Sequence, residues 1–402
     1  MSAFRFNPLE QLSLDQLRRR TSQKWQAHGG DILPLWVAEM DVLLAPPVAE
    51  ALHRAVEMGD TGYAANHGYA EAVESFAASR WGWCSFPTGD TRVLADVMTA
   101  IVEAVRVSSD VGDAVIVTSP VYAPFFSYIA HCNREVIEVP LTVDHRIDTA
   151  AIGAALEEVR KSGRNSLVLI ANPHNPTGTV HTRAELEALA EITADLGVRV
   201  LADEIHGPLI LPGSSFVPFL TVASSENAMT FTSASKGWNL AGAKAALVIA
   251  GKLAAADLRR IPTEIDYAPS HLGVLAHTAA FTEGVDWLDD LIAGLDANRS
   301  LLGQLLAVHL PAVRWTPPEG TYLGWLDCRA LDAPRMEAKT GFAEAIDIEG
   351  HARLFFDRAG VAVNSGHIFG SGGAGHVRIN FATSQAILTG AVERMGRAIA
   401  GS

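Results

Sequence analysis

Between about residues 90 and 250, short apolar runs alternate with longer segments whose apolar residues recur at helical spacing. Four of these runs cover residues 114–118, 166–171, 198–202 and 229–232. Strands that are almost continuously apolar are typical of a parallel sheet that is buried on both faces. We therefore expect an α/β fold in which helices sandwich a mostly parallel sheet.

Polar residues follow the ends of these predicted strands. Four of them are Tyr122, Asn175, Asp203 and Lys236. Right-handed crossovers bring the carboxyl ends of parallel strands to one edge of a sheet, and open α/β sheets bind their ligands at that edge. The sequence therefore predicts that these four side chains converge on one site.

The pattern changes after about residue 283, where a long helix (285–308) is followed by short strands and a glycine-rich loop (364–375). This indicates a smaller α+β domain. Near the N-terminus we expect one short helix around residues 14–26. The expected division of the chain has three parts: an N-terminal arm with part of the small domain (1–48), a large domain (49–284) and a small C-terminal domain (285–402).

Composition limits the classes of function. The 402-residue chain has a net charge of −14 and no dense Lys/Arg run, which argues against a nucleic-acid partner. Its three cysteines, Cys84, Cys132 and Cys328, are too far apart for a disulfide framework or a zinc motif, so we expect no metal. Without a signal peptide or a membrane-spanning apolar run, we expect a cytoplasmic protein with no membrane partner.

Lys236 stands in the sequence Thr-Ser-Ala-Ser-Lys-Gly-Trp-Asn (232–239), which we expect to form a loop. A lysine among small and apolar residues can have a lowered pKa and act as an amine nucleophile, although most lysines are surface charges. Ser233 and Lys236 also match the Ser-x-x-Lys motif of penicillin-binding enzymes, and Lys-Thr-Gly occurs at 339–341. That family also needs Ser-Asp-Asn, which this chain lacks, and residues 335–346 are predicted as helix instead of strand.

Three motifs occur in order, each after a predicted strand: Asn-Pro-Thr-Gly at 175–178, Asp-Glu-Ile-His at 203–206 and Ser-Ala-Ser-Lys at 233–236. Together they resemble the fold type I pyridoxal-phosphate (PLP) enzymes of the class I/II aminotransferase superfamily, over nearly the whole chain. Three segments are most similar to the MalY/PatB branch: Trp-Val-Ala-Glu-Met-Asp at 36–41, Asp-Glu-Ile-His at 203–206 and Ser-Lys-Gly-Trp-Asn at 235–239. Members of that branch are cystathionine β-lyases or cysteine-S-conjugate β-lyases.

The resemblance implies roles around the PLP ring. Lys236 is expected to be the Schiff-base lysine and to move the Cα proton. Asp203 should pair with the pyridine nitrogen, although the residue alone would suggest a helix N-cap. Asn175 should donate to the phenolic oxygen, near which His206 occupies the position of a tyrosine in many relatives. Tyr122 should stack on the ring, where the bland alternative is a core aromatic.

The resemblance also implies a phosphate site. Backbone N–H groups of Val97 and Met98 at a helix start should bind the phosphate, and Ser233 should add a hydroxyl. Lys244 stands where many relatives have a phosphate-binding arginine, although a surface lysine is the alternative. Asp96 replaces the glycine common in this loop, so we expect its side chain to point away from the phosphate.

For the substrate, the resemblance implies that Arg378 grips the α-carboxylate with its planar guanidinium. Ala38 is expected at the substrate site as well. Tyr63 should reach across a two-fold interface to the partner's cofactor phosphate, which implies a homodimer. The alternative for Tyr63 is a loop tyrosine that packs on its own domain.

The expected activity is that of a PLP-dependent carbon–sulfur lyase. β-Elimination from L-cystathionine, a small-molecule amino-acid substrate, would give homocysteine, pyruvate and ammonia and would serve methionine biosynthesis. Other cysteine S-conjugates remain open because no motif identifies the pocket of the leaving thiol. The alternatives are a class I/II aminotransferase that uses the same site, and a binding or regulatory module that retains the fold.

Overall fold

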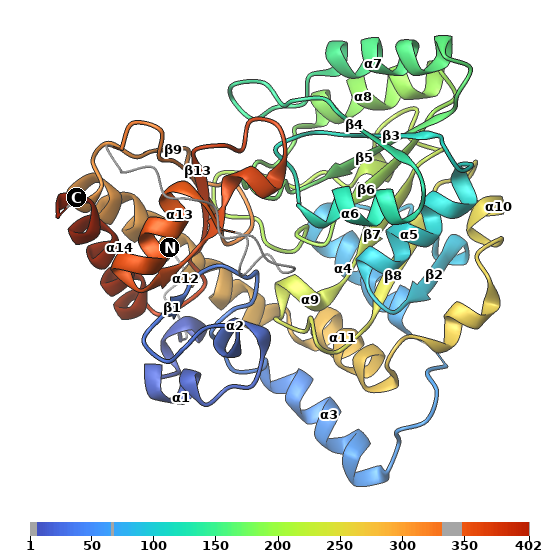
Figure 1. The fold of residues 1–402 in the computed structure, drawn as a ribbon. Coiled ribbons are helices and arrows are strands. Elements are labelled where there is room, and N and C mark those ends of the chain that lie inside the picture. The colour runs from blue at the N-terminus through green and yellow to red at the C-terminus, as the bar shows by residue number, and fades with distance from the viewer. Residues whose placement is uncertain (1–5, 66–67, 332–347, 402) are drawn as a thin grey trace.

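The computed structural model describes residues 6–65, 68–331 and 348–401, and its centre is a seven-stranded sheet (Figure 1). Across the sheet the strands are β2 (Thr91–Leu94), β8 (Ala246–Ala250), β7 (Met229–Thr232), β6 (Arg199–Asp203), β5 (Ser166–Ala171), β3 (Ala114–Val117) and β4 (Glu135–Glu138). Strand β8 runs antiparallel to both of its neighbours, and the other adjacent pairs are parallel. The predicted mostly parallel sheet is confirmed.

Helices cover both faces of this sheet, and alternate side chains of each strand enter different cores. In β3, Val115 and Val117 join one cluster with α5 (Val97–Ser108), α6 (Pro124–His131) and α10 (Ala255–Leu258). Ile116 points to the opposite face and joins α7 (Thr149–Lys161) and α8 (Arg183–Asp195). The period of two along a strand thus places the predicted apolar runs between two helical layers.

A third core lies beside the sheet, where α11 (His271–Glu283) packs against α3 (Pro46–Met58) and α4 (Tyr69–Trp81). Buried residues lie around most of α11, including Val274, His277 and Phe281. For that reason no amphipathic pattern in the sequence marks this helix. None of the helices in the described ranges is long and apolar enough to cross a membrane.

The C-terminal part forms the smaller α+β unit that the sequence predicts. An antiparallel sheet has the order β12 (Asn364–Ser365), β13 (His376–Asn380), β10 (Leu323–Asp327), β9 (Arg314–Trp315). It is accompanied by α12 (Val285–His309), α13 (Gly350–Leu354), a π-helical turn (Phe355–Ala359) and α14 (Gln385–Ala400). In addition, β1 (Leu33–Pro34) pairs with β11 (Val361–Ala362), which attaches the N-terminal segment to this unit.

Three local predictions need correction. The predicted helix over 14–26 is two short helices, α1 (Leu14–Arg18) and α2 (Gln23–Gln26), because Ser13 and Ser22 each start a separate helix. The loop 364–375 begins with strand β12 and a 3₁₀ turn (Gly366–Phe369). Lys236 lies in a short helix, α9 (Ala234–Gly237), and not in a loop. The predicted helix at 335–346, with its Lys-Thr-Gly sequence, lies outside the described residues.

Candidate active site

A cavity of 260 Å³ lies at the carboxyl ends of β5, β6 and β7. It brings together most of the predicted site residues: Ala38, Val97, Met98, Tyr122, Asn175, Asp203, His206, Lys236 and Lys244. The lining also contains residues to which the sequence assigned no binding role: Asp96, Tyr128, Ala171, Ile205, Ser235 and Ala241. Arg378, Ser233 and Tyr63 do not line it. The convergence of the four strand-end side chains is therefore present in the structure.

The side chain of Lys236 extends from α9 to the backbone of the N-terminal segment. Its Nζ donates to the carbonyl oxygen of Ala38 at 2.9 Å. The same carbonyl accepts a second hydrogen bond, at 2.8 Å, from the hydroxyl of buried Tyr322. A neutral carbonyl that is satisfied by two donors holds the lysine amine inside the cavity without a carboxylate at this contact. Tyr322 is a site residue that no motif in the sequence indicates.

Segment 36–41, which carries Ala38, is held by side chains from three distant parts of the chain. The amide of Asn239 exchanges two hydrogen bonds with the backbone of Met40, at 2.8 and 3.1 Å. Asn380 in β13 donates to two carbonyls of the segment, at 2.7 and 2.6 Å. Lys24 and Asp41 form an ion pair at 2.8 Å in which each side chain is 1% exposed. Because Lys24, Asp41 and Asn380 are buried and Asn239 is half-buried, these contacts hold the Ala38 carbonyl in one position.

Asp203 ends β6 and is buried beside the cavity. Its Oδ1 accepts from the backbone N–H of Ile205 at 3.1 Å, and a turn follows, so the alternative of a helix N-cap is wrong. Burial raises the pKa of this carboxyl to about 7, although the Ile205 N–H and the charge of Lys236 act in the opposite direction. A carboxyl in this state is suited to pairing with a cationic ring nitrogen, which would restore its charged form.

His206 and Tyr122 line other walls of the cavity. His206 is buried, and its Nδ1 has no hydrogen-bond partner within the described part of the chain. Burial, together with the charges of Lys236 and Arg378, holds the pKa of His206 well below its ordinary value, so the ring is neutral. Tyr122 is half-buried and lines the cavity. Its ring packs edge-on against Phe125, with 5.6 Å between the two ring centres.

Arg378 reaches the cavity through Asn175. Its Nη1 donates to Asn175 Oδ1 at 2.9 Å, and its Nη2 donates to the Trp36 carbonyl at 3.0 Å and to Asn364 Oδ1 at 2.6 Å. The guanidinium also lies 4.9 Å from the centre of the Phe369 ring. These three acceptors are neutral, and the guanidinium is only 2% exposed. Such a group suits the binding of a substrate carboxylate.

At the other end of the cavity, α5 begins at Val97, and its first backbone N–H groups have no partner inside the helix. Asp96 is the N-cap of this helix and also forms an ion pair with Lys244 at 2.9 Å. Asp96 and Lys244 both line the cavity. The expectation that the Asp96 side chain points away from the phosphate stays a prediction.

Of the two serines near Lys236, Ser235 and not Ser233 lines the cavity. The Ser233 hydroxyl is buried, donates to the carbonyl of Ala245 at 2.8 Å and accepts from the N–H of Ser235 at 3.2 Å as the N-cap of α9. The hydrogen bonds of the Ser233 hydroxyl are thus made within the chain, at the start of α9. The two serine hydroxyls also lie 2.8 Å apart, and the predicted contact of Ser233 with a phosphate stays a prediction.

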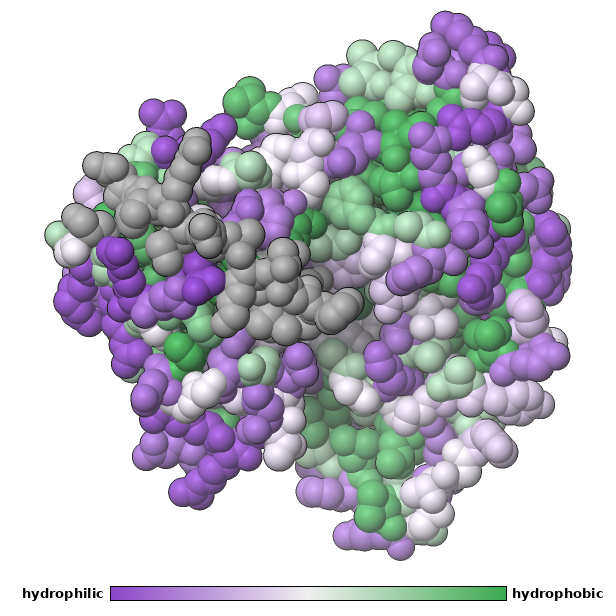
Figure 2. Space-filling model, viewed as in Figure 1, coloured by the Kyte–Doolittle hydropathy of each residue, from purple (hydrophilic) through white to green (hydrophobic). Residues whose placement is uncertain are grey.

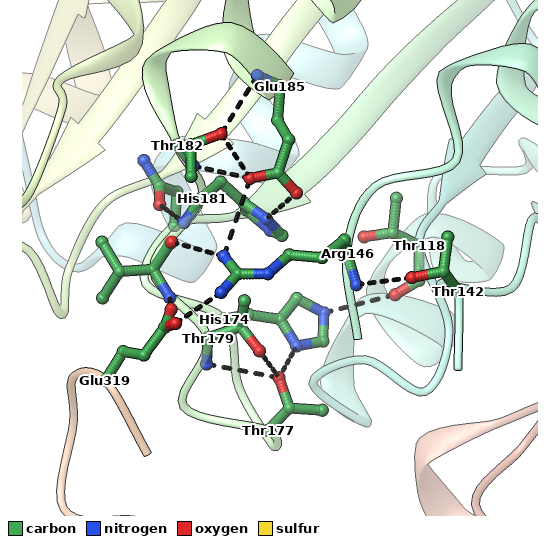
Figure 3. A network of polar contacts seen from close by, with 12 residues as sticks. Thr118, Thr142, Arg146, His174, Thr177, Thr179, His181, Thr182, Glu185 and Glu319 are labelled. Atoms are coloured by element: carbon green, nitrogen blue, oxygen red, sulfur yellow. Dashed lines mark hydrogen bonds and ion pairs between the residues drawn. The ribbon is translucent and has the colours of Figure 1, made fainter. Parts of the chain in front are cut away.

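The loop that carries Asn175 is held by the polar network in Figure 3. His174 lies between the Thr177 hydroxyl, 2.9 Å from Nδ1, and the Thr118 carbonyl, 3.3 Å from Nε2. Burial, and the neighbouring His181 after it, hold the pKa of His174 well below its ordinary value. A neutral histidine with both ring nitrogens occupied fixes the loop, and with it the amide of Asn175.

Arg146 and Glu319 connect this loop to the segment before β10 (Figure 3). Arg146 pairs with Glu319 and donates to the Val180 carbonyl at 2.9 Å, and Glu319 accepts from the Val180 N–H at 2.8 Å. The N–H groups of Glu319 and Gly320 both donate to the Gly178 carbonyl at 2.9 Å. Gly178 has φ +71°, and a Cβ there would lie 2.3 Å from Pro318, so the close approach requires glycine.

Comparison with known proteins shows the family of this chain. The model of the family "Aminotransferase class I and II" matches residues 31–395, and the chain belongs to this family. A Mycobacterium leprae protein with a provisional cystathionine β-lyase name is 56% identical, over 98% of both chains. Cystathionine β-lyase PatB of Bacillus subtilis is 30% identical, over 94% of this chain and 96% of its own. The structure of cystalysin from Treponema denticola, which contains pyridoxal 5'-phosphate, superposes with TM-score 0.86 at 28% identity, over 98% and 99% of the two chains.

The residues present fit pyridoxal 5'-phosphate. The cavity offers an amine for the aldehyde (Lys236) and a buried carboxyl for the ring nitrogen (Asp203). The unpartnered Nδ1 of buried His206 is available for a polar group of a ligand. The start of α5 and Lys244 provide N–H donors and a positive charge at the end where a phosphate would lie.

Proposed function

We propose that this protein is a PLP-dependent carbon–sulfur lyase that cleaves L-cystathionine, or a related cysteine S-conjugate, by β-elimination. The observation that carries the proposal is Lys236, whose amine lies in a strand-end cavity beside the buried carboxyl of Asp203. The lyase names of relatives that align over almost the whole chain support the choice of reaction. The coarser proposal, a PLP enzyme of this family, does not depend on which thiol leaves.

When bound, PLP supplies an electron sink that makes the Cα proton of an amino acid removable. The residues of the chain provide the rest. Lys236 would hold the cofactor covalently and, once freed, would accept the Cα proton on Nζ. Asp203 would keep the ring nitrogen protonated, and Asn175 and His206 would serve the phenolic oxygen. Tyr122 would pack against the ring face.

The remaining groups orient the cofactor and the substrate. Backbone N–H groups of Val97 and Met98, with Lys244 and Ser233, are assigned to the phosphate. Arg378 is assigned to the substrate α-carboxylate. Asn175 accepts from Arg378 Nη1 and is therefore placed to contact the same carboxylate. The Ala38 carbonyl, which accepts from Lys236 Nζ at 2.9 Å, positions the amine before and after it acts. Holding the reacting groups in place supplies part of the rate enhancement.

Incubation with cystathionine should release homocysteine, pyruvate and ammonia in equal amounts, with no keto acid added. Elimination regenerates the cofactor in its starting form, so no amino-group acceptor is needed. Homocysteine can be followed with a thiol reagent, pyruvate with lactate dehydrogenase, and ammonia with a colorimetric reagent on stopped samples, so that no keto acid enters the reaction. A rate that depends on added 2-oxoglutarate, with glutamate accumulating, would instead identify an aminotransferase.

We infer a homodimer from the surface around α3. Apolar side chains gather over this helix (Figure 2), and Val56, Met58 and Tyr63 on or after it are between 63% and 82% exposed. Tyr63 touches Tyr267 at a ring distance of 5.6 Å and does not line the cavity of its own chain. We propose that Tyr63 completes the partner's site at the cofactor phosphate.

Mixed dimers test this arrangement. Lys236→Ala and Tyr63→Ala homodimers should each be impaired, whereas refolding the two together should raise the activity above either parent. In the mixed dimer one site carries both defects, but the other has an intact Lys236 and receives an intact Tyr63. If mixed dimers form, as shown by separable tags, and activity is only the average of the parents, Tyr63 does not act across the interface.

The cellular setting is part of the proposal. Homocysteine requires one methyl transfer to become methionine, which supports a place in methionine biosynthesis. The chain's net charge of −14 and its widely spaced cysteines support a cytoplasmic enzyme with no nucleic-acid partner.

A further inference from the structure

The start of α5 carries a negative charge at the place where a phosphate would bind. Oδ1 of Asp96 accepts from the backbone N–H of Thr99 at 2.8 Å. Its Oδ2 accepts from Lys244 Nζ at 2.9 Å. Both side chains line the cavity, with exposed fractions of 30% for Asp96 and 52% for Lys244. The Lys244 ammonium, which is the group proposed to bind the phosphate, is thus already paired with Asp96.

The charge on Asp96 is present at neutral pH. Burial acts to raise the pKa of this carboxyl, but the Thr99 N–H and the Lys244 ammonium together hold the pKa below its ordinary value. A helix N-terminus attracts anions because its N–H dipoles point outward. The carboxylate of Asp96 is itself stabilised by this attraction, and its negative charge repels a second anion at the same helix end. The N–H groups of Val97 and Met98, however, are not the ones that Asp96 caps.

We propose that Asp96 competes with the cofactor phosphate for Lys244 and for the N-terminus of α5, and so sets the affinity for PLP below what this cavity could reach. The inference rests on the proposed function, because it places the PLP phosphate at this end of the cavity. When phosphate binds, the Lys244 ammonium turns from the Asp96 carboxylate toward it or is shared between the two. In either case the phosphate lies beside a carboxylate whose charge Lys244 no longer fully compensates.

The test is the Asp96→Asn variant of the full-length chain, freed of cofactor and titrated with pyridoxal 5'-phosphate. Asparagine still caps the helix at Thr99, so the change removes charge and keeps the fold. The dissociation constant should fall by roughly tenfold at low salt, since the charges are a few ångströms apart and partly solvated, and by less at high salt. Absorbance and quenching of tryptophan fluorescence report binding independently of activity.

Two controls isolate the phosphate. Pyridoxal, which lacks the phosphate, should bind Asp96→Asn no more tightly than it binds the parent. Asp90→Asn removes an aspartate that pairs with Arg259 at 3.1 Å outside the cavity, and should change neither affinity. Equal gains for PLP and pyridoxal would overturn the inference, because a general loosening of the site would explain them.

The outcomes separate this inference from the proposed function. If the parent binds PLP and Asp96→Asn binds it equally or more weakly, the competition does not exist, and in the weaker case Asp96 holds Lys244 in place for the phosphate. If neither the parent nor the variant binds PLP, the proposed function is wrong and this inference falls with it.

Discussion

Replacing Lys236 by alanine should lower the rate of β-elimination by about four orders of magnitude, because one group both holds the cofactor and moves the proton. The variant should still fold. The Ala38 carbonyl loses the lysine but keeps its 2.8 Å hydrogen bond from Tyr322, so no buried acceptor is left without a donor. Borohydride should fix PLP to a peptide that contains Lys236 in the parent and should fix none in the variant.

Lys252→Ala is the matched control, since this exposed lysine lies after β8 outside the cavity. Its activity and its borohydride labelling should equal those of the parent. Full elimination activity in Lys236→Ala, with its thermal unfolding unchanged, would remove Lys236 from the mechanism. Loss of folding in this variant would contradict the role assigned to Tyr322 at the Ala38 carbonyl.

Arg378→Lys should reduce kcat/KM for cystathionine about 10²-fold or more while PLP remains bound. Lysine keeps the charge, but a single ammonium cannot make the contacts that Nη1 and Nη2 make to Asn175, Trp36 and Asn364 at the same time. A substrate carboxylate would therefore meet a misplaced point charge. Cofactor absorbance and thermal unfolding, measured beside the kinetics, distinguish lost binding from lost folding.

Arg329→Lys provides the comparison, because this arginine is 66% exposed and pairs only with Asp327 among the ion pairs of the described residues. Its kinetics should match those of the parent. If Arg378→Lys is as active as the parent, the α-carboxylate is bound elsewhere. If the loss also appears with a substrate that lacks the carboxylate, Arg378 acts through Asn175 instead.

The sheet was predictable because its signal is local. Apolar runs such as 166–171 and 229–232 coincide with β5 and β7, and the side chains that follow them meet in one cavity. The antiparallel direction of β8 was not predictable, since a strand buried on both faces is apolar whichever way it runs. Helix α11 was not predicted for a similar reason. Its contacts with α3 and α4 bury so much of its surface that no polar stripe remains in its sequence.

Parts of the site depend on contacts between residues that are distant in the chain. Asp96 and Lys244 are 148 positions apart, and neither residue alone indicates the ion pair. Tyr322 acts on the Ala38 carbonyl from 284 positions away, and in the sequence it is one more apolar residue beside β10. Motif spacing also does not reveal that Ser233 caps α9 while Ser235 lines the cavity. The domain division at residues 48 and 284 stays a prediction.

The attachment of segment 36–41 has a consequence for the order of assembly during synthesis. The backbone of residues 33–41 bonds to Gly360, Ala362 and Ala382, and Asn380 holds the segment through its side chain. During synthesis, residues 33–41 leave the ribosome long before the C-terminal residues that will hold them. A nascent chain stopped before β13 can build the large sheet and α9, yet it holds the segment that carries the Ala38 carbonyl only through earlier contacts such as Asn239–Met40 and Lys24–Asp41. The first part of the polypeptide to emerge is thus among the last to reach its place.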